Sequence, residues 1–311
     1  MRKLALNRFS QIGPLIGLIV ITILLTFLSD SFFTVNNLLN LLRQISINAL
    51  IAFGMTFVVL TAGIDLSVGS LLALGSALTA GLLASGMDPL LAIFLGLLIG
   101  LALGAVNGLI ITKGKVAPFI ATLATMTVFR GATLVYTDGK PITGLSDSTV
   151  FEMIGRGYLF GIPFPIIIML IVFLILMFVL KSTVFGRQVY AVGGNEEAAI
   201  LSGIKTDRVK IWVYSLTGML SVLAGIILTS RLNSAQPTAG NMYELDAIAA
   251  VVIGGTSLMG GRGRIVGTLI GALIIGVIGN GLNLLNVSSF YQQIVKGGVI
   301  LLAVLLDRRT K

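Results

Sequence analysis

Long apolar runs recur along the whole chain, and they constrain its fold more than any other feature. Most runs hold about 16 to 23 residues, so each can cross a hydrocarbon core of about 30 Å as a helix, given some tilt. We expect ten membrane spans, at residues 12–28, 45–61, 68–85, 90–112, 118–136, 165–180, 211–229, 245–258, 265–285 and 294–306.

The composition indicates that lipid surrounds the protein. Hydrophobic residues make up 56% of the 311 positions and charged residues 11%, too few charges to cover a soluble domain of this size. The sequence therefore predicts one all-α domain over residues 1–311, a polytopic transmembrane helical bundle of about ten spans. Runs 245–258 and 294–306 are short for a full crossing, so broken or re-entrant helices are expected. Glycines spaced four residues apart between positions 96 and 108 predict close helix packing.

Basic residues favour one side of this bundle. With the N-terminus in the cytoplasm, fifteen Lys and Arg residues fall in inside segments and four in outside segments, as the positive-inside rule requires. An even number of spans places the C-terminus on the same side. We therefore expect both termini in the cytoplasm, a long periplasmic segment at about 137–164 and a long cytoplasmic segment at about 181–210.

Several residue types that carry enzyme chemistry are missing. Cysteine and histidine are both absent, which removes disulfides, thiolate catalysis and the commonest general base. The sequence has no G-x-x-x-x-G-K-[ST] phosphate loop, so any ATP hydrolysis that powers this protein must occur on another chain. The net charge of +9 is spread between apolar runs, which argues against nucleic acid as a partner. We expect a transport subunit in contact with membrane lipid, with no catalytic site and no cofactor.

Residues 195–204 predict a short helix inside the internal segment. Asn195 is a good N-cap, and Glu196 and Glu197 lie in the first turn, where the helix dipole favours acids. Gly203 is placed to end the helix. A helix of ten residues is about 15 Å long and marginal alone in water. It therefore rests on another surface, either a cytoplasmic ATPase or the cytoplasmic face of the bundle itself.

Polar residues in the spans are candidates for a solute path. Asp65 lies in a short break between two apolar spans, and irregular backbone at membrane depth is expected only beside protein or a water-filled path. Helix capping by Asp65 or Ser67 is compatible with that role. Neutral polar groups in spans suit a hydroxylated solute, although they more often bond neighbouring helices. The candidate path residues are Asn48, Thr61, Asp65, Ser67, Asn107 and Asn283.

Three further charges fall at membrane depth, where a charge is costly unless it is paired, hydrated or near an interface. Arg130 is placed to anchor or pair near the outer end of its span. Lys296 is placed to snorkel toward the outer surface. Asp246 is placed to cap the short span at 245–258.

Several segments resemble one known family. The stretch TAGIDLSVGS at residues 61–70 resembles a signature of ABC-type sugar-importer permeases of the ribose, xylose and galactose group. The similarity to the ribose branch is high in SAQPTAG at 234–240, YELDAIAA at 243–250, GGTSL at 254–258 and GGRGR at 260–264. It extends from about residue 32 to about residue 306.

The resemblance implies a homodimeric sugar-import permease of the bacterial inner membrane, with ribose as the expected sugar. It also implies a cytoplasmic ABC ATPase and a periplasmic sugar-binding protein as partners, with alternating access driven by ATP. Other pentoses, hexoses or a furanosyl signalling molecule remain alternatives, because relatives in the group carry them. The residues expected to couple to the ATPase are Glu196, Glu197, Ala198, Ala199 and Gly203.

Two other classes of protein remain as alternatives. A secondary sugar carrier driven by an ion gradient would need acidic residues in the membrane, and these are scarce. An intramembrane enzyme would need paired carboxylates, a catalytic dyad or a metal cluster, which the predicted spans lack.

Overall fold

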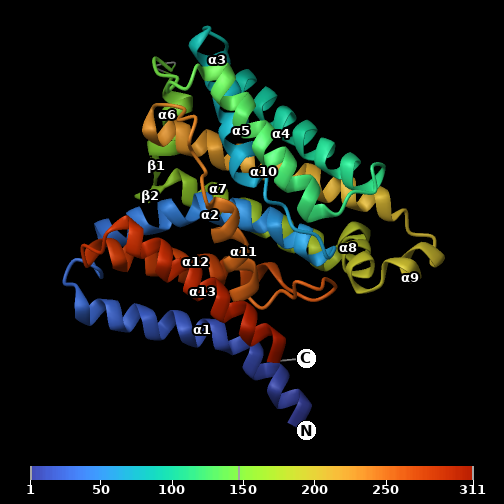
Figure 1. Cartoon of the computed structure of the whole chain (residues 1–311). Helices are drawn as coiled ribbons and strands as arrows, with labels where there is room; N and C mark the ends of the chain where they lie inside the picture. The colour runs from blue at the N-terminus through green and yellow to red at the C-terminus, as the bar shows by residue number, and fades with distance from the viewer. Residues whose placement is uncertain (1, 146–147, 310–311) are drawn as a thin grey trace.

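The computed structural model describes residues 2–145 and 148–309, which fold almost entirely into helices (Figure 1). Each of the ten expected spans coincides with a helix among these residues, which confirms the prediction of an all-α membrane bundle. These helices are α1 (Arg2–Leu28), α2 (Val35–Leu60), α3 (Val68–Ala84), α4 (Pro89–Thr112), α5 (Pro118–Thr137), α7 (Phe164–Ser182), α10 (Thr206–Leu232), α11 (Tyr243–Ile253), α12 (Ile265–Leu284) and α13 (Ser289–Arg309).

The helices differ in whether they are long enough to span a bilayer. Within the described residues, six are long and apolar enough, namely α2, α4, α5, α7, α10 and α12. α3 and the apolar part of α1 are shorter. α11 has 11 residues and is therefore about 16 Å long, about half the hydrocarbon thickness. α11 fits the expected broken or re-entrant helix, whereas the number of full crossings stays a prediction.

α2 and α10 form the centre of the bundle. Ala49, Phe53 and Phe57 of α2 are fully buried, and α10 packs against α2, α3 and α4. In Figure 1, α3, α4, α5 and α10 form the upper part and α1, α12 and α13 the lower part, with α2, α7 and α11 between them. The two parts therefore share one central layer.

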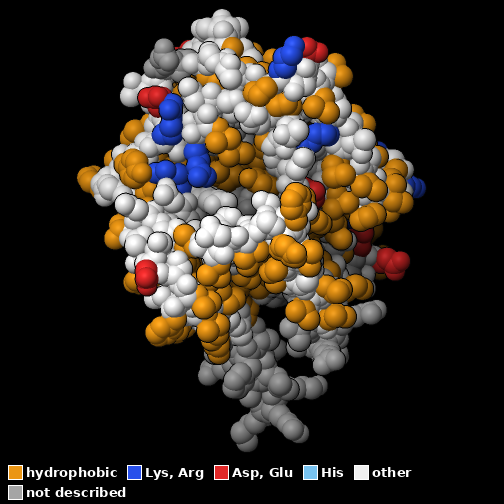
Figure 2. Space-filling model, turned by 60° about the vertical axis from the view of Figure 1, so that its left-hand side comes forward, with side chains coloured by type: hydrophobic (Ala, Val, Ile, Leu, Met, Phe, Trp, Pro, Cys, Tyr) orange, Lys and Arg blue, Asp and Glu red, His pale blue; other side chains and the backbone are white. Residues whose placement is uncertain are grey.

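The outside of the bundle is apolar over wide areas. Phe94 of α4 and Phe178 of α7 are 58% and 63% exposed. Figure 2 shows hydrophobic side chains over much of the face in view, with Lys and Arg side chains gathered beside a hollow. An apolar exterior of this kind is expected where lipid replaces water as the solvent.

The glycine stripe of α4 lies against α10. A Cβ added to Gly104 would lie 2.2 Å from the carbonyl oxygen of Tyr214, and one added to Gly100 would lie 2.8 Å from that of Gly218. Only glycine permits this approach, so the predicted use of the stripe in helix packing is confirmed.

The connecting elements gather at two ends of the bundle. α6 (Thr149–Arg156) and the hairpin of β1 (Tyr158–Leu159) and β2 (Ile162–Pro163) lie at the left end in Figure 1. β1 pairs antiparallel with β2, with Leu159 opposite Ile162. α8 (Val184–Gly194) and α9 (Glu196–Leu201) lie at the right end, toward which both chain termini also run.

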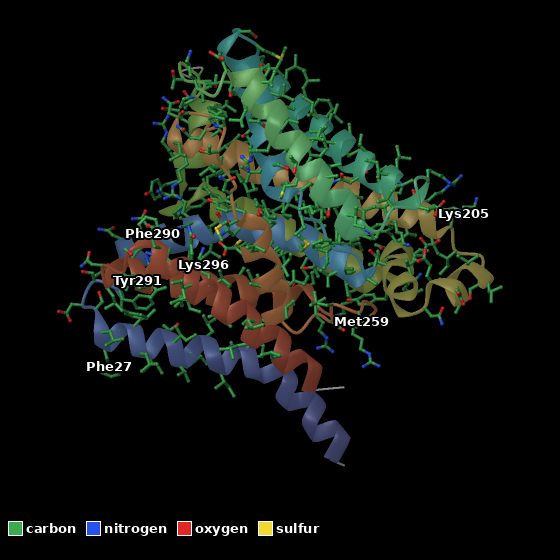
Figure 3. All side chains as sticks on the ribbon, viewed as in Figure 1. Phe27, Lys205, Met259, Phe290, Tyr291 and Lys296 are labelled. Carbon is green, nitrogen blue, oxygen red and sulfur yellow. The ribbon has the colours of Figure 1, made fainter. Side chains whose placement is uncertain are left out.

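Exposed aromatic residues mark one end and a basic residue the other. Phe27, Phe290 and Tyr291 lie at the left end in Figure 3 and are 86%, 80% and 66% exposed. Lys205 lies at the right end. Aromatic rings at the ends of membrane helices are typical of the membrane–water interface.

The segment at 137–164 is packed onto the bundle. The Ser230 hydroxyl at the end of α10 donates to the carbonyl of Phe151, and the amide of Gly155 donates to the Ser230 hydroxyl at 3.0 Å. Ile142 also forms an antiparallel bridge with Ala235. This segment therefore covers the end of α10 and holds the start of the loop after it.

Two sequence predictions need correction. The internal segment at 181–210 holds two helices, α8 and α9, where we expected one. α9 is also shorter than expected, because Asn195 is its cap and the chain leaves the helix after Leu201. α2 begins at Val35, ten residues before the predicted span, so Arg43, one of the four basic residues counted in outside segments, lies inside this helix.

Candidate functional site

A buried polar cluster occupies the break between α2 and α3. Asp65 is fully buried, and its Oδ1 accepts hydrogen bonds from the backbone amide and the hydroxyl of Ser67 at 2.9 and 2.6 Å. Asn107 of α4 donates from Nδ2 to the Ser67 hydroxyl at 2.7 Å. Three of the predicted path residues, Asp65, Ser67 and Asn107, therefore meet in one cluster, and Asp65 caps the turn into α3.

Two acceptors of this cluster have unused capacity. Oδ2 of Asp65 and Oδ1 of Asn107 are buried and have no hydrogen-bond partner among the described residues. Most buried polar atoms are paired, because an unpaired one has lost its bonds to water. The cluster is thus able to accept hydrogen bonds from a hydroxylated molecule or water.

Helices on both sides hold the break in place. The carbonyl of Ile64 accepts from the Thr122 hydroxyl of α5 at 3.2 Å and lies 3.5 Å from the Tyr214 hydroxyl of α10. A Cβ added to Gly63 would lie 2.6 Å from that same Tyr214 oxygen. The Thr61 hydroxyl donates to the carbonyl of Val58 at 2.8 Å. Thr61 therefore lies at the end of α2 and does not join the cluster.

The loop after α10 returns into the bundle before α11 begins. Gly240, with a φ of +73°, lies so close to α3 that a Cβ on Gly69 would lie 2.1 Å from its carbonyl oxygen. Nη1 of Arg130 donates to the carbonyls of Pro237 and Ala239 at 2.7 and 2.8 Å. Arg130 therefore pairs with backbone oxygens, and this pairing satisfies the otherwise exposed carbonyls of the re-entrant segment 234–242.

A second polar site joins α11 and α13. Nζ of Lys296 lies 2.8 Å from Oδ2 of Asp246, whose side chain is only 7% exposed. The pair borders a small pocket of about 40 Å³ that also includes Asn48 and Gln44. The prediction that Asp246 is the N-cap of its helix was wrong, because Met242 occupies that position and the Asp246 carboxylate binds Lys296 instead. Snorkelling of Lys296 stays a prediction.

The remaining path candidates lie apart from the cluster. Asn48 belongs to the pocket beside Asp246, and its Oδ1 is buried without a partner among the described residues. Asn283 is exposed near the end of α12 and accepts from Gln292 at 2.8 Å. The cluster at the break, Asn48 and Asn283 thus lie in three different places, and their role in a solute path stays a prediction.

Some residues around the break could not be identified from the sequence. Thr122 and Tyr214 are each one of several polar residues inside long, largely apolar helices, and many such residues only bond their own helix. Their approach to Ile64 depends on which helices become neighbours. The pairing of Asp246 with Lys296 could have been predicted from the sequence, since two opposite charges in the membrane stabilise each other.

α9 carries the predicted coupling residues at one end of the bundle. The amide of Ala198 donates to Oδ1 of Asn195 at 2.9 Å, and Gly203 has a φ of +82°. The amides of Gly203 and Ile204 donate to Ile200 and Ala199 at 2.9 and 3.0 Å. The predicted N-cap and glycine stop are therefore both confirmed.

The predicted coupling residues face in two directions. Glu196 binds Nζ of Lys210 at 2.6 and 2.7 Å, and Ala199 is buried, so these two attach α9 to the bundle. Glu197 and Ala198 are exposed, and Leu201 is 89% exposed. Leu201 was not among the predicted coupling residues, although an apolar residue in a polar segment is a signal for an external partner.

α8 and the loop after α11 cover one side of the break. The Tyr190 hydroxyl donates to the carbonyl of Gly263 at 2.9 Å. Burial raises the pKa of Tyr190, against an opposing effect of Arg264, so the hydroxyl keeps its proton for this bond. Gly193 lies so near the end of α2 that a Cβ would be 1.7 Å from the carbonyl of Leu60. α8 therefore packs directly against the end of α2 that precedes the break.

Comparison with known proteins places this arrangement in a family. A family profile described as "Branched-chain amino acid transport system / permease component" matches residues 37–304. The chain belongs to this permease family. It is thus a multi-pass membrane permease, and the matched region includes the break, the re-entrant segment and α9.

Individual relatives of the permease are named for sugars. It is 68% identical to the ribose import permease protein RbsC of Bacillus subtilis (strain 168), over 96% of this chain and 93% of the relative. It is 58% identical to the protein of the same name from Haemophilus influenzae, over 94% and 91%. It is 44% identical to the D-allose transport system permease protein AlsC of Escherichia coli (strain K12), over 93% and 89%. No solved structure matches this chain.

Proposed function

We propose that this permease is the translocation subunit of an ABC importer for ribose. The observation that carries the proposal is the 68% identity to a ribose import permease over 96% of the chain. The family description names branched-chain amino acids, but the similar relatives named above are sugar permeases, which favours a sugar as the solute.

The polar cluster at the break suits such a solute. A pentose is neutral and carries several hydroxyl groups, each of which can donate one hydrogen bond. Oδ2 of Asp65 and Oδ1 of Asn107 have no hydrogen-bond partner among the described residues. Both side chains bind Ser67 through their other polar atom. Both are buried, so a sugar reaches them only after neighbouring helices move, as alternating access requires.

A separate ATPase supplies the energy. α9 rests on the bundle through Glu196 and Ala199. It presents Leu201 and Glu197 outward. We assign this face to the ATPase. A periplasmic sugar-binding protein delivers the sugar to the opposite end, and a second copy of the permease completes the pathway.

The test is transport by purified components. The permease is reconstituted in liposomes with its ATPase and binding protein, and labelled sugar uptake and ATP hydrolysis are measured with ribose, allose and xylose. Ribose should give the fastest uptake and the largest stimulation of ATP hydrolysis. Collapse of ion gradients should leave uptake unchanged.

Two results would contradict the proposal. Faster uptake of allose or xylose than of ribose would reject ribose as the sugar while leaving the importer intact. Uptake that continues without ATP and stops when an ion gradient is collapsed would identify a secondary carrier instead.

A further inference from the structure

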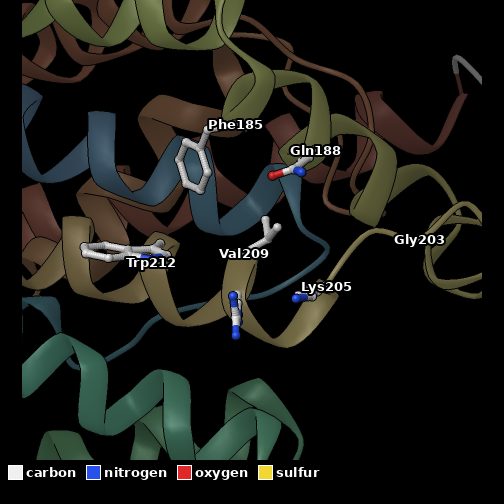
Figure 4. A pocket seen from close by; sticks show the side chains of 7 residues that line it. Phe185, Gln188, Gly203, Lys205, Val209 and Trp212 are labelled. Atoms are coloured by element: carbon white, nitrogen blue, oxygen red, sulfur yellow. The ribbon is translucent and has the colours of Figure 1, made fainter.

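A cavity of about 470 Å³ lies between α8 and the start of α10. Its walls include Phe185 and Gln188 of α8 and Lys205, Arg208, Val209 and Trp212 around the first turns of α10. Figure 4 shows Trp212 toward one end of the cavity and Lys205 toward the other. The cavity thus has an aromatic end and a basic end.

The basic end carries charge that no described residue neutralises. Lys205 and Arg208 are exposed and have neither an ion pair nor a side-chain hydrogen bond within residues 2–145 and 148–309. Two acids near them along the chain are already engaged, and the exposed Glu197 forms no ion pair with either cation. Asp207 binds Lys113 at 2.8 Å, and Glu196 binds Lys210 at 2.6 Å. The two free cations therefore favour an anion from outside the chain.

The aromatic end of the cavity is partly exposed and lies beside apolar helix surface. Trp212 is 59% exposed and lies six residues into α10, about 9 Å along the helix. α7, which leads into α8, exposes Phe178 and Ile175. Tryptophan at this level is typical of the boundary between headgroups and acyl chains. An occupant with an anionic head and an apolar tail matches both ends.

We propose that this cavity binds an anionic phospholipid. The phosphate lies between Lys205 and Arg208, where it receives charge-assisted hydrogen bonds. The first part of one acyl chain lies against Trp212 and Phe185. The proposal depends on the position of the protein in a membrane and is independent of the solute that it carries.

Trp212 provides a direct measurement, because it is the single tryptophan of the chain. The full-length protein is placed in phosphatidylcholine nanodiscs that contain a small fraction of lipid brominated near the carboxyl end of its acyl chains. Brominated phosphatidylglycerol should quench Trp212 fluorescence at a roughly tenfold lower mole fraction than brominated phosphatidylcholine, as expected for two basic groups near one anionic lipid.

Paired variants separate a built site from general attraction. Lys205→Gln/Arg208→Gln should abolish the preference for phosphatidylglycerol. The control Lys115→Gln/Arg262→Gln removes the same charge from exposed positions outside the cavity and should keep the preference. Three results would overturn the proposal: equal quenching by both lipids in the unmodified protein, an unchanged preference in the first variant, or loss of the preference in the control.

Discussion

Asp65 stays inside the bundle because its neighbour Ser67 supplies two hydrogen bonds to one carboxylate oxygen. A buried carboxylate without such partners would be far more costly. The other oxygen has no partner among the described residues. Its charge and its free acceptor are thus separate properties of the same side chain, and substitutions can distinguish them.

Asp65→Leu should impair sugar uptake more than Asp65→Asn does. Leucine leaves the amide and hydroxyl of Ser67 without their acceptor, at a cost of about 1–3 kcal/mol, whereas asparagine keeps one acceptor oxygen. Uptake of labelled ribose is measured per amount of protein inserted in the membrane. Normal uptake by well-inserted Asp65→Leu would contradict a role for the cluster in transport.

Lys296→Gln should destabilise the permease by about 2 kcal/mol, below the range for a fully buried pair because Lys296 is 30% exposed. The change leaves the carboxylate of Asp246 without its cation. The double variant Asp246→Asn/Lys296→Gln should recover most of the stability, since no charge then remains. Thermal unfolding in detergent measures all three variants, and equal stability of Lys296→Gln and the unmodified protein would show that the pair contributes nothing.

Helices in this chain are held by two kinds of contact, close backbone packing in the bundle and caps at the ends. α4 approaches α10 through glycines, and α9 depends on Asn195 and Gly203. In lipid, apolar side chains gain nothing by leaving solvent, so small residues and hydrogen bonds decide which helices meet. Substitutions at glycines therefore test both kinds of contact.

Gly104→Ala should weaken the contact of α4 with α10 by about 1–3 kcal/mol, because the new methyl group meets the Tyr214 carbonyl at 2.2 Å. Gly131→Ala is the matched control. It also lies within a membrane helix, and a Cβ there meets nothing within 4 Å, so it should be neutral or slightly stabilising. Similar unfolding temperatures for both variants would contradict the packing role of the stripe.

Gly203→Val should preserve membrane insertion, weaken ATPase binding and abolish sugar uptake. Space is not the reason, since nothing lies within 4 Å of an added Cβ, but valine at a φ of +82° costs about 1–2 kcal/mol. Gly203→Asn tolerates this backbone better and should retain more binding. The measurement is co-purification of the ATPase together with ribose uptake.

α9 has no coupling role if Gly203→Val and a deletion of residues 195–204 both bind the ATPase and import ribose normally.

The sequence predicts elements of this permease better than their contacts. Eight of the ten helices begin within five residues of the predicted start, and α1 and α2 begin ten residues earlier, since apolar length reveals a membrane helix. α8 was missed because its amphipathic surface lacks such length. The cluster of Asp65 with Asn107 was not predicted as a contact, because it depends on packing between distant helices.

On the scale of the whole molecule, the two ends of the bundle differ in charge and in attached elements. α8, α9 and both termini lie toward one end, and α6 with the β hairpin lies at the other. The basic residues concentrate in the loops of the first end, which we assign to the cytoplasm.

Single cysteines test this orientation, because the chain has none of its own. Ser202→Cys should react with a membrane-impermeant thiol reagent only after the membrane is opened. Lys140→Cys, at the other end, should react in intact cells. The assignment is reversed if Ser202→Cys is labelled from outside and Lys140→Cys is protected.

The bond between Arg130 and the re-entrant segment has a consequence for biosynthesis. Arg130 precedes its acceptor Pro237 by 107 residues, so at a synthesis rate of about 5–20 residues per second it waits roughly 5–20 s for these carbonyls. During that interval a guanidinium group stands in the nascent bundle without its final partner. α11 is too short to insert by its own hydrophobicity, so its entry depends on contacts with helices already in place, and the bond between Arg130 and the loop before α11 is one of them.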